Sequence, residues 1–502
     1  MNQAYLISRG TEEFAAAREQ FAVIVDRLQS AAVLGMEHGE VERLVSREGT
    51  ELLRRLLQAH FDVRTGREKR EAGVRGVDGI MRSQVRQGCP RRLETLFGAV
   101  EIRRCGYSAP EEGSLFPLDG DLNLPKDSYS HGLRERLAFE VARGSFDQAV
   151  RAIETTGGQV PKRQAEELTA KVSRDFEAFY RHRASPGPEP TLDPLVMSQD
   201  GKGIVMRKED LREGTKRAAE RDAHKLKTRL SQGEKRNRKR MATVAAVYSI
   251  ERQVRTPGSI LGAEGKQEKA PKARARHKRV WASVERTPEE VTEEVFQEAR
   301  RRDPEGKRPW VMLVDGHEGQ LEDIHAAIER HGVEVTLILD FIHVLEYLWK
   351  AAWCFFTPGD EAAEAWVGER GLRILEGKAS DVAAGMRRSA TLRDLCQEER
   401  KGVDTCADYL VKYREMLRYD RYLAEGFPIA TGVIEGACRH LVKDRMDITG
   451  ARWRLRSAEA VLKLRSLHSS GDTEAYWAFH KAEEQERNHL SRMASQDFRK
   501  AA

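Results

Sequence analysis

The chain has 502 residues, of which 40% are hydrophobic and 33% are charged. Lysine and arginine exceed aspartate and glutamate by a formal charge of +6. This composition excludes collagen-like, fibrous and wholly disordered chains, and the length suggests about three domains. Because no signal-peptide pattern opens the sequence and charged residues interrupt its best apolar stretch, we expect a cytoplasmic protein with no membrane partner.

Positive charge is distributed unevenly along the chain. It is concentrated between residues 202 and 279 and again between residues 439 and 465. An uneven distribution of this kind indicates a polyanionic partner. The six cysteines are scattered without a Cys-x-x-Cys pair, so we expect reduced thiols rather than a disulfide framework.

The N-terminal part of the chain predicts helices that bind DNA. Residues 1–88 are rich in charged helix formers and predict a helical arm. Residues 89–184 begin with β-type residues around Gly98, which predict a small hairpin. Two helices follow, the first capped by Ser145 and the second beginning near Pro161. This order favours a helix-turn-helix DNA-binding region, although an ordinary helical hairpin fits the same pattern.

A proline-rich linker at 185–190 is followed by an α/β pattern. Strands are predicted near 195–206, 242–249, 280–284, 310–314 and 335–339, with helices after the third and fourth strands. Three strands followed by helix, strand, helix and strand is the order of the RNase H-like fold. We therefore predict that 185–342 form the first part of an α/β RNase H-like catalytic domain, with a basic insertion at about 207–240.

Three acidic residues occupy related places on this predicted frame. Asp200 lies on the first strand, Asp315 follows the fourth strand, and Glu435 lies in the first turn of a helix that begins near Thr431. In this fold the first and fourth strands pair, and adjacent strands lie about 5 Å apart. Converging carboxylates predict two Mg²⁺ or Mn²⁺ ions that catalyse phosphodiester cleavage and strand transfer. Each acid taken alone also fits a turn residue or a solvated surface residue.

The stretches around these acids carry the most specific patterns in the chain. They are residues 198–207 (SQDGKGIVMR), 233–244 (GEKRNRKRMATV), 314–316 (VDG), 339–346 (LDFIHVLE) and 431–441 (TGVIEGACRHL). From about residue 90 onward, a sequence with these stretches resembles the bacterial insertion-sequence transposases of the ISKra family (the Kra-four group). Members of that family have a DDE catalytic domain.

The resemblance implies roles for several parts of the chain. Asp200, Asp315 and Glu435 would form the catalytic triad, and the helices of 343–428 would form a helical insertion domain. Residues 429–502 would supply the last part of the RNase H-like core and the C-terminal helices. A homo-oligomer on DNA, a dimer or higher, is also implied. Relatives often carry a cysteine pair before a Pro-Leu-Asp motif, whereas this chain has Cys105 without a partner there, so zinc is not expected.

Asp340 and His343 match a D-x-x-H signature of the same family. Asp340 also ends a strand and therefore competes with Asp315 as the second acid, although the strand order favours Asp315. At i and i+3 on a helix start, Asp340 and His343 would face each other and support the wall of the active site. They fit equally well as an N-cap and a core histidine.

Basic residues close to the predicted acids in the chain are candidates for binding DNA phosphates. Arg439 and Lys443 follow Glu435 at i+4 and i+8 and would share its helix face. Trp453 is flanked by arginines and would either bracket a base or fill a gap in the core. The candidate DNA-binding residues are Lys235, Arg236, Arg238, Lys239, Arg240, Arg439, Lys443, Arg452, Trp453 and Arg454. Solvated charged faces remain the alternative for the basic runs.

The sequence therefore predicts a DNA transposase. It would bind double-stranded DNA at the ends of an insertion sequence and in the target, and it would be associated with the bacterial nucleoid. One alternative is an RNase H-like nuclease that hydrolyses nucleic acid without strand transfer. Another is a DNA-binding regulator without enzymatic activity, derived from a transposase.

Overall fold

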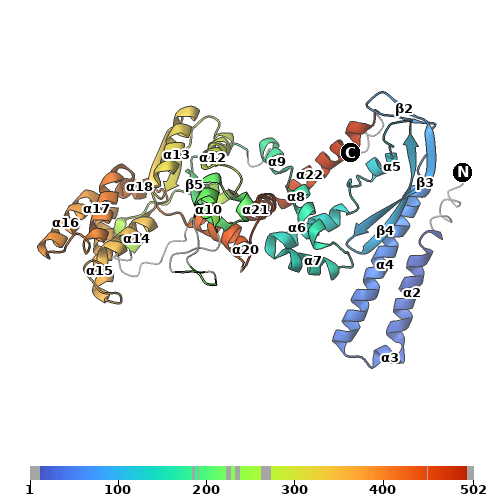
Figure 1. Cartoon of the computed structure of the whole chain (residues 1–502), viewed down its shortest axis with the longest axis horizontal. Helices are drawn as coiled ribbons and strands as arrows, with labels where there is room; N and C mark the ends of the chain where they lie inside the picture. Colours follow the sequence, from blue (N-terminus) through green and yellow to red (C-terminus); the bar gives the residue numbers. More distant parts are fainter. Residues whose placement is uncertain are drawn as a thin grey trace. The chain divides into compact units, whose positions relative to one another are not determined.

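The computed structural model describes residues 12–183, 187–189, 191–221, 226, 228–231, 238–261, 273–448 and 450–494. The chain forms two compact units (Figure 1). Unit 1 comprises Met1–His182 and Asp472–Ala502, and unit 2 comprises Arg183–Gly471. Within the described ranges, no helix has both the length and the apolar character needed to cross a lipid bilayer.

Unit 1 begins with the predicted helical arm. Helix α2 (Ala15–Gln29), the short α3 (Ala31–Leu34) and α4 (His38–Gly66) form it, and α2 packs along α4. The Gln20 amide donates a hydrogen bond to Glu48 between the two helices. The helices of the arm end at Gly66, short of the predicted bound at residue 88, and the short strands β1 (Val74–Arg75) and β2 (Met81–Arg82) follow. The predicted hairpin is present as β3 (Gln84–Thr95) and β4 (Gly98–Ser108), and β4 packs against α4.

The helices of the predicted DNA-binding region are also present. After α5 (Pro117–Asp121), they are α6 (His131–Arg143), α7 (Phe146–Glu154), α8 (Lys162–Val172) and α9 (Phe176–His182). Ser145 caps α7, since its side chain accepts a hydrogen bond from the Gln148 amide and the Gln148 side chain accepts one from the Ser145 amide. Such a reciprocal pair satisfies two amides that the first helical turn leaves without partners. Helix α6 packs against both α7 and α8.

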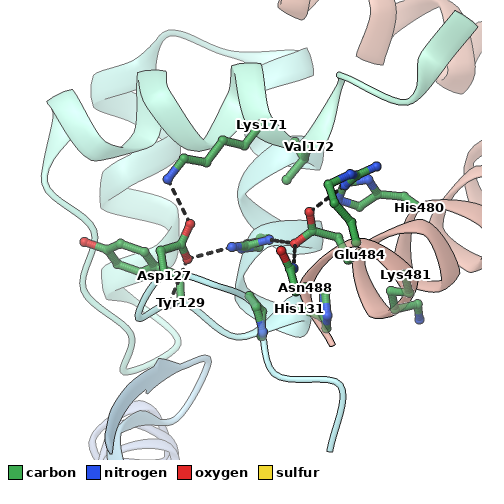
Figure 2. A network of polar contacts seen from close by, with 12 residues as sticks. Asp127, Tyr129, His131, Lys171, Val172, His480, Lys481, Glu484 and Asn488 are labelled. Atoms are coloured by element: carbon green, nitrogen blue, oxygen red, sulfur yellow. Dashed lines mark hydrogen bonds and ion pairs between the residues drawn. The ribbon is translucent and has the colours of Figure 1, made fainter. Parts of the chain in front are cut away.

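The C-terminal helix corrects one predicted boundary. Residues 429–502 were expected to remain with the catalytic sheet, but α22 (Thr473–Asn488) belongs to unit 1. Figure 2 shows the polar network that joins α22 to this unit. Glu484 of α22 pairs with the buried Arg134 at 3.1 Å, and Arg134 pairs with Asp127 at 2.7 Å. His480 Nδ1 lies 2.6 Å from Asp175. Buried charges need partners of opposite sign, and α22 finds its partners in unit 1.

Unit 2 is built on a mixed five-stranded sheet in the order β7-β6-β5-β8-β9. The strands are β5 (Leu195–Val205), β6 (Lys239–Ser249), β7 (Arg276–Ser283), β8 (Trp310–Val314) and β9 (Val335–Leu339). Strand β5 is antiparallel to β6 and parallel to β8, and β8 is parallel to β9. The predicted pairing of the first strand with the fourth is confirmed. Every residue of β8 is buried, as expected for a strand covered on both faces.

Helices cover both faces of this sheet. Thr292 of α12 (Pro288–Arg302) donates a hydrogen bond to the side chain of Gln199. The next residue, Asp200, accepts one from Cys438, which begins the π-helical turn Cys438–Lys443 after α19 (Gly432–Ala437). Because consecutive strand residues point to opposite faces, α12 and the α19 segment lie on opposite sides of β5. Helix α13 (Glu318–His331) connects β8 to β9 and packs against α12.

Helix α21 (Leu455–Ser470) covers the edge strand β7. The amides of Val280, Ala282 and Val284 donate hydrogen bonds to Ser470, Ser466 and Glu459, respectively. These three side chains follow one another along the helix, so they satisfy alternate free amides of the edge.

The region between β9 and α19 is helical, as the sequence predicts. Its helices are α14 (Phe341–Ala352), α15 (Glu361–Leu375), α16 (Ala379–Leu392), α17 (Lys401–Lys412) and α18 (Tyr419–Ala424). Unit 2 also contains the short helices α10 (Glu213–Arg221), α11 (Pro257–Leu261) and α20 (Asp444–Met446).

Candidate active site

Asp200 lies on the central strand of the sheet, partly exposed to solvent. Its Oδ2 accepts a hydrogen bond from the Cys438 thiol at 3.1 Å, and its Oδ1 lies 2.6 Å from the Gly201 amide. Burial, followed by the nearby charge of Asp200, raises the pKa of the Cys438 thiol well above its usual range. The thiol therefore remains a hydrogen-bond donor at neutral pH.

Asp315 follows directly after strand β8. Its Oδ1 accepts a hydrogen bond from the His317 amide at 2.9 Å, which forms a tight turn before α13. Gly316 within this turn has a φ of +89°, a conformation that side chains with a Cβ rarely adopt. The sequence Asp315-Gly316 thus satisfies the turn and places a carboxylate at the end of a buried strand.

The two aspartates occupy equivalent positions on the adjacent strands β5 and β8. Strands β5 and β8 pair in register up to Ser198 and Leu313. Asp200 and Asp315 each lie two residues beyond that pair, and paired strands are about 5 Å apart. Within the described parts of the chain, no ion pair joins either aspartate to a lysine or arginine. The strand register therefore places the two aspartates at neighbouring positions on adjacent strands.

Glu435 is exposed in the first turn of α19. It lies three residues before Cys438, and residues three apart on a helix are neighbours on its surface. Since Cys438 contacts Asp200, Glu435 is placed near the central strand from the α19 side. The helix N-terminus also favours a negative charge at this position.

Asp340 has a structural role in this site. It is the N-cap of α14 and is fully buried, with Oδ1 accepting a hydrogen bond from the Ile342 amide at 2.8 Å. Its other oxygen accepts a hydrogen bond from the Thr431 hydroxyl. Asp340 is thus sealed inside the protein as a helix cap, whereas Asp315 is partly exposed, which favours Asp315 over Asp340 as the second acid.

His343 faces Asp340 as the i, i+3 spacing predicts. The Nδ1 atom of His343 lies 3.5 Å from Asp340 Oδ2. The contact with Asp340 raises the pKa of His343 to about 9, and the charges of Glu346 and Asp315 act in the same direction. The imidazole therefore carries a positive charge at neutral pH close to the carboxylates.

The oxygen atoms of the three acids are the hard donors that Mg²⁺ prefers. Asp200 and Asp315 fit such an ion by their place on adjacent strands. In the described residues, however, no group of three or more His, Cys, Asp or Glu side chains is arranged to hold a metal ion. Glu435 would have to turn its exposed side chain toward the aspartates to complete a three-carboxylate site.

The predicted DNA-binding residues of 235–240 differ in exposure and in hydrogen bonding. Lys235 and Arg236 lie outside the described residues. Arg238 precedes β6, and Lys239 is exposed at its start. Arg240 donates hydrogen bonds to the carbonyls of Asp210, Val284 and Glu285. Its guanidinium is therefore engaged by the fold, which favours a structural role for Arg240 over the predicted phosphate contact.

The segment after Glu435 differs from the predicted α-helix. Arg439 and Lys443 lie in the π-helical turn, where i to i+5 hydrogen bonds replace the α-helical spacing. The predicted α-helical spacing from Glu435 to Lys443 is therefore not kept, and Lys443 is exposed at the end of this turn. Arg439 remains a candidate, because its side chain is 79% exposed and its nearest acid, Asp444, lies 3.8 Å away.

Trp453 fills a gap in the core, the second of its two predicted roles. It is only 6% exposed, and its indole Nε1 donates a hydrogen bond to the Met446 carbonyl at 2.9 Å. A buried indole cannot bracket a base, so its assignment to DNA binding is wrong. Arg452 and Arg454 on either side of it are exposed and remain candidates.

Sequence reasoning missed four side chains that support the carboxylates. Cys438 contacts Asp200, Thr431 contacts Asp340, and two tyrosines contact the Asp315 turn. Cys438 had a detectable signal, because it follows Glu435 by three residues on a predicted helix. The tyrosines, Tyr409 and Tyr413, have an i, i+4 spacing, but nothing in the sequence connects them to Asp315.

The site thus combines paired aspartates on central strands, a glutamate on an adjoining helix and exposed arginines from the same C-terminal segment. Comparison of the chain with protein-family models and with curated proteins finds no match. The chemistry of these residues is therefore the basis for inferring the function of the chain.

Proposed function

We propose that this chain is a DNA transposase of the insertion-sequence type, similar to the ISKra family, with an RNase H-like catalytic domain. One observation carries the proposal. Asp200 and Asp315 each lie two residues beyond the last paired residues of the adjacent strands β5 and β8. The sheet order, with the first strand in the centre and paired to the fourth, supports the RNase H-like assignment. Glu435 is the proposed third acid.

The proposed chemistry assigns a task to each group of residues. Two Mg²⁺ or Mn²⁺ ions, when bound, would activate the attacking oxygen and stabilise the leaving oxygen. Asp200, Asp315 and Glu435 would hold these ions. The exposed Arg439, Arg452 and Arg454, with Lys443, would bind the phosphates of double-stranded DNA at the element ends and in the target. The proposal includes a homo-oligomer on nucleoid DNA.

The test is cleavage of donor DNA that carries the element ends, in the presence of Mg²⁺. We expect Asp200→Asn, Asp315→Asn and Glu435→Gln each to reduce cleavage by about 1000-fold, or about 4 kcal/mol of transition-state stabilisation. Glu322→Gln is the matched control, because Glu322 is an exposed acid on α13 seven residues after Asp315. The control should cleave as the wild type does. Unchanged cleavage in any of the three variants would remove that acid from the site.

The products distinguish the proposal from its alternatives. Joined donor and target strands would support a transposase. Hydrolysed strands without joined products would replace it with an RNase H-like nuclease. Specific binding of the element ends without cleavage of any strand would replace it with a DNA-binding regulator.

A further inference from the structure

We propose that Tyr409 and Tyr413 are positioning residues for Asp315, so that the helical region 343–428 determines how well the second acid binds its metal ion. The inference deepens the proposed function and rests on it. It assigns a specific task to a region that the sequence identifies only as an insertion.

The two tyrosines hold consecutive carbonyls of the turn that carries the acid. The Tyr409 hydroxyl donates a hydrogen bond to the Asp315 carbonyl at 2.8 Å. The Tyr413 hydroxyl donates one to the Gly316 carbonyl at 2.6 Å. Because two adjacent peptide groups are fixed in this way, the direction in which the Asp315 side chain leaves the backbone is fixed as well.

The rings of the same tyrosines enclose the turn. A Cβ at Gly316 would lie 3.1 Å from a ring carbon of Tyr413 and 3.2 Å from one of Tyr409. The same Cβ would lie 3.4 Å from a methyl carbon of Leu339, at the end of β9. The turn therefore has little space to shift, and only glycine fits between the rings in this conformation.

The tyrosines are themselves held in place by the helical region. Tyr347 of α14 stacks on Tyr409 with ring centroids 3.9 Å apart and an angle of 11° between the planes. Tyr409 and Tyr413 meet edge to face at 5.1 Å. Gly402 allows α17 to approach α14 closely, since a Cβ there would clash with the Lys350 carbonyl oxygen. The position of the turn thus depends on the packing of α14 against α17.

The Tyr409 hydroxyl supports the proposed metal ligand from behind, through the backbone carbonyl of Asp315. Support of this kind by groups behind a metal ligand affects metal affinity by about 10-fold to 100-fold in other proteins.

The experiment compares the variants Tyr409→Phe, Tyr413→Phe and the double variant, which remove hydroxyl groups and keep the rings. Tyr422→Phe is the matched control, because the Tyr422 hydroxyl also donates to a backbone carbonyl in unit 2, that of Glu415 at 3.1 Å. Binding of Mn²⁺ to the full chain is measured without DNA by the EPR signal of the free ion. The Mg²⁺ dependence of donor cleavage and the thermal midpoint are measured on the same samples.

We expect the double variant to bind Mn²⁺ about 10-fold more weakly and to need about 10-fold more Mg²⁺ for half-maximal cleavage. High Mg²⁺ should restore much of its cleavage rate. The single variants should fall between the double variant and the wild type, and Tyr422→Phe should change metal affinity less than about 2-fold. A role limited to stability would lower the thermal midpoint without this shift in metal dependence.

Two failures are distinguishable. Tyrosine variants with wild-type Mn²⁺ affinity and Mg²⁺ dependence, alongside an inactive Asp315→Asn, would overturn the inference and leave the proposed function standing. A wild-type chain that neither binds Mn²⁺ nor cleaves donor DNA would overturn the proposed function and, with it, the inference.

Discussion

Unit 2 contains two groups of acidic side chains that differ in the kind of partner that binds their carboxylates. Glu298 of α12 is 1% exposed and forms ion pairs with four arginines at 2.6–3.2 Å. These arginines are Arg183, Arg279, Arg301 and Arg302. Asp200 and Asp315 instead have backbone amides and a thiol as their hydrogen-bond donors.

The difference shows which carboxylate stabilises the fold and which is available to a ligand. A buried carboxylate surrounded by guanidinium groups is already neutralised, and removing it leaves uncompensated cations. Carboxylates on adjacent strands repel each other where they come close, and a bound divalent ion would offset that repulsion. We therefore treat the Glu298 group as structural and the aspartate pair as a candidate ligand site.

The largest expected effect is the loss of protein stability when Glu298 is replaced. We expect Glu298→Gln to lower the free energy of unfolding by about 3–5 kcal/mol, because four arginines lose their shared partner. Asp200→Asn should leave the free energy unchanged or raise it slightly, since it removes a repulsive charge. Urea unfolding measures both. Glu305→Gln, at an exposed ion pair with Lys307, is the control and should change the free energy by less than about 1 kcal/mol. A reversed order of the Glu298 and Asp200 variants would break the comparison.

The Asp340 and His343 pair stands between these two extremes and predicts a pH effect. Because the pKa of His343 is raised from 6.5 to about 9, its pairing stabilises the folded state fully below pH 6.5. That contribution is lost as the pH rises through about 9. Asp340→Asn keeps an N-cap for α14 and removes the negative charge.

We expect the pKa of His343 to fall from about 9 toward 6.5 in Asp340→Asn, as measured by NMR titration of the metal-free protein. Asp315→Asn is the control, because Asp315 contributes less to the shift than Asp340 does. If the pKa of His343 fell in Asp315→Asn and not in Asp340→Asn, the imidazole would belong with the candidate ligand site and not with the Asp340 cap.

Local patterns predicted elements in both units. The Ser145 cap and the hairpin around Gly98 in unit 1, and the five strands of unit 2, all depend on short-range periodicity and turn chemistry. The pairing of β5 with β8 followed from the order of these strands. These features were predictable because the chain within each element specifies them.

The remaining features depend on contacts between distant parts of the chain. The pairing of Glu484 with Arg134 assigns α22 to unit 1, and the hydroxyl of Tyr409 reaches Asp315 across 94 residues of sequence. The π-helical turn at Cys438–Lys443 was not predicted, because a single turn with i to i+5 bonding does not alter the apolar periodicity of the sequence enough to be seen. Periodicity alone could not supply these details.

The smallest expected effect separates an exposed arginine from one engaged by the fold. Arg439→Ala should weaken binding of element-end DNA and reduce the slope of log K against log salt by about 1, because one phosphate contact is lost. Arg240→Ala should leave the slope unchanged and lower the free energy of unfolding by about 1–3 kcal/mol, because three carbonyls lose their donor. Binding titrations at several salt concentrations, together with urea unfolding, measure both quantities. Arg240→Ala could instead reduce the slope of log K against log salt and leave the free energy of unfolding unchanged. In that case the Arg240 guanidinium contacts DNA instead of those carbonyls, and the distinction between arginines bound by the fold and arginines available to DNA does not hold for Arg240.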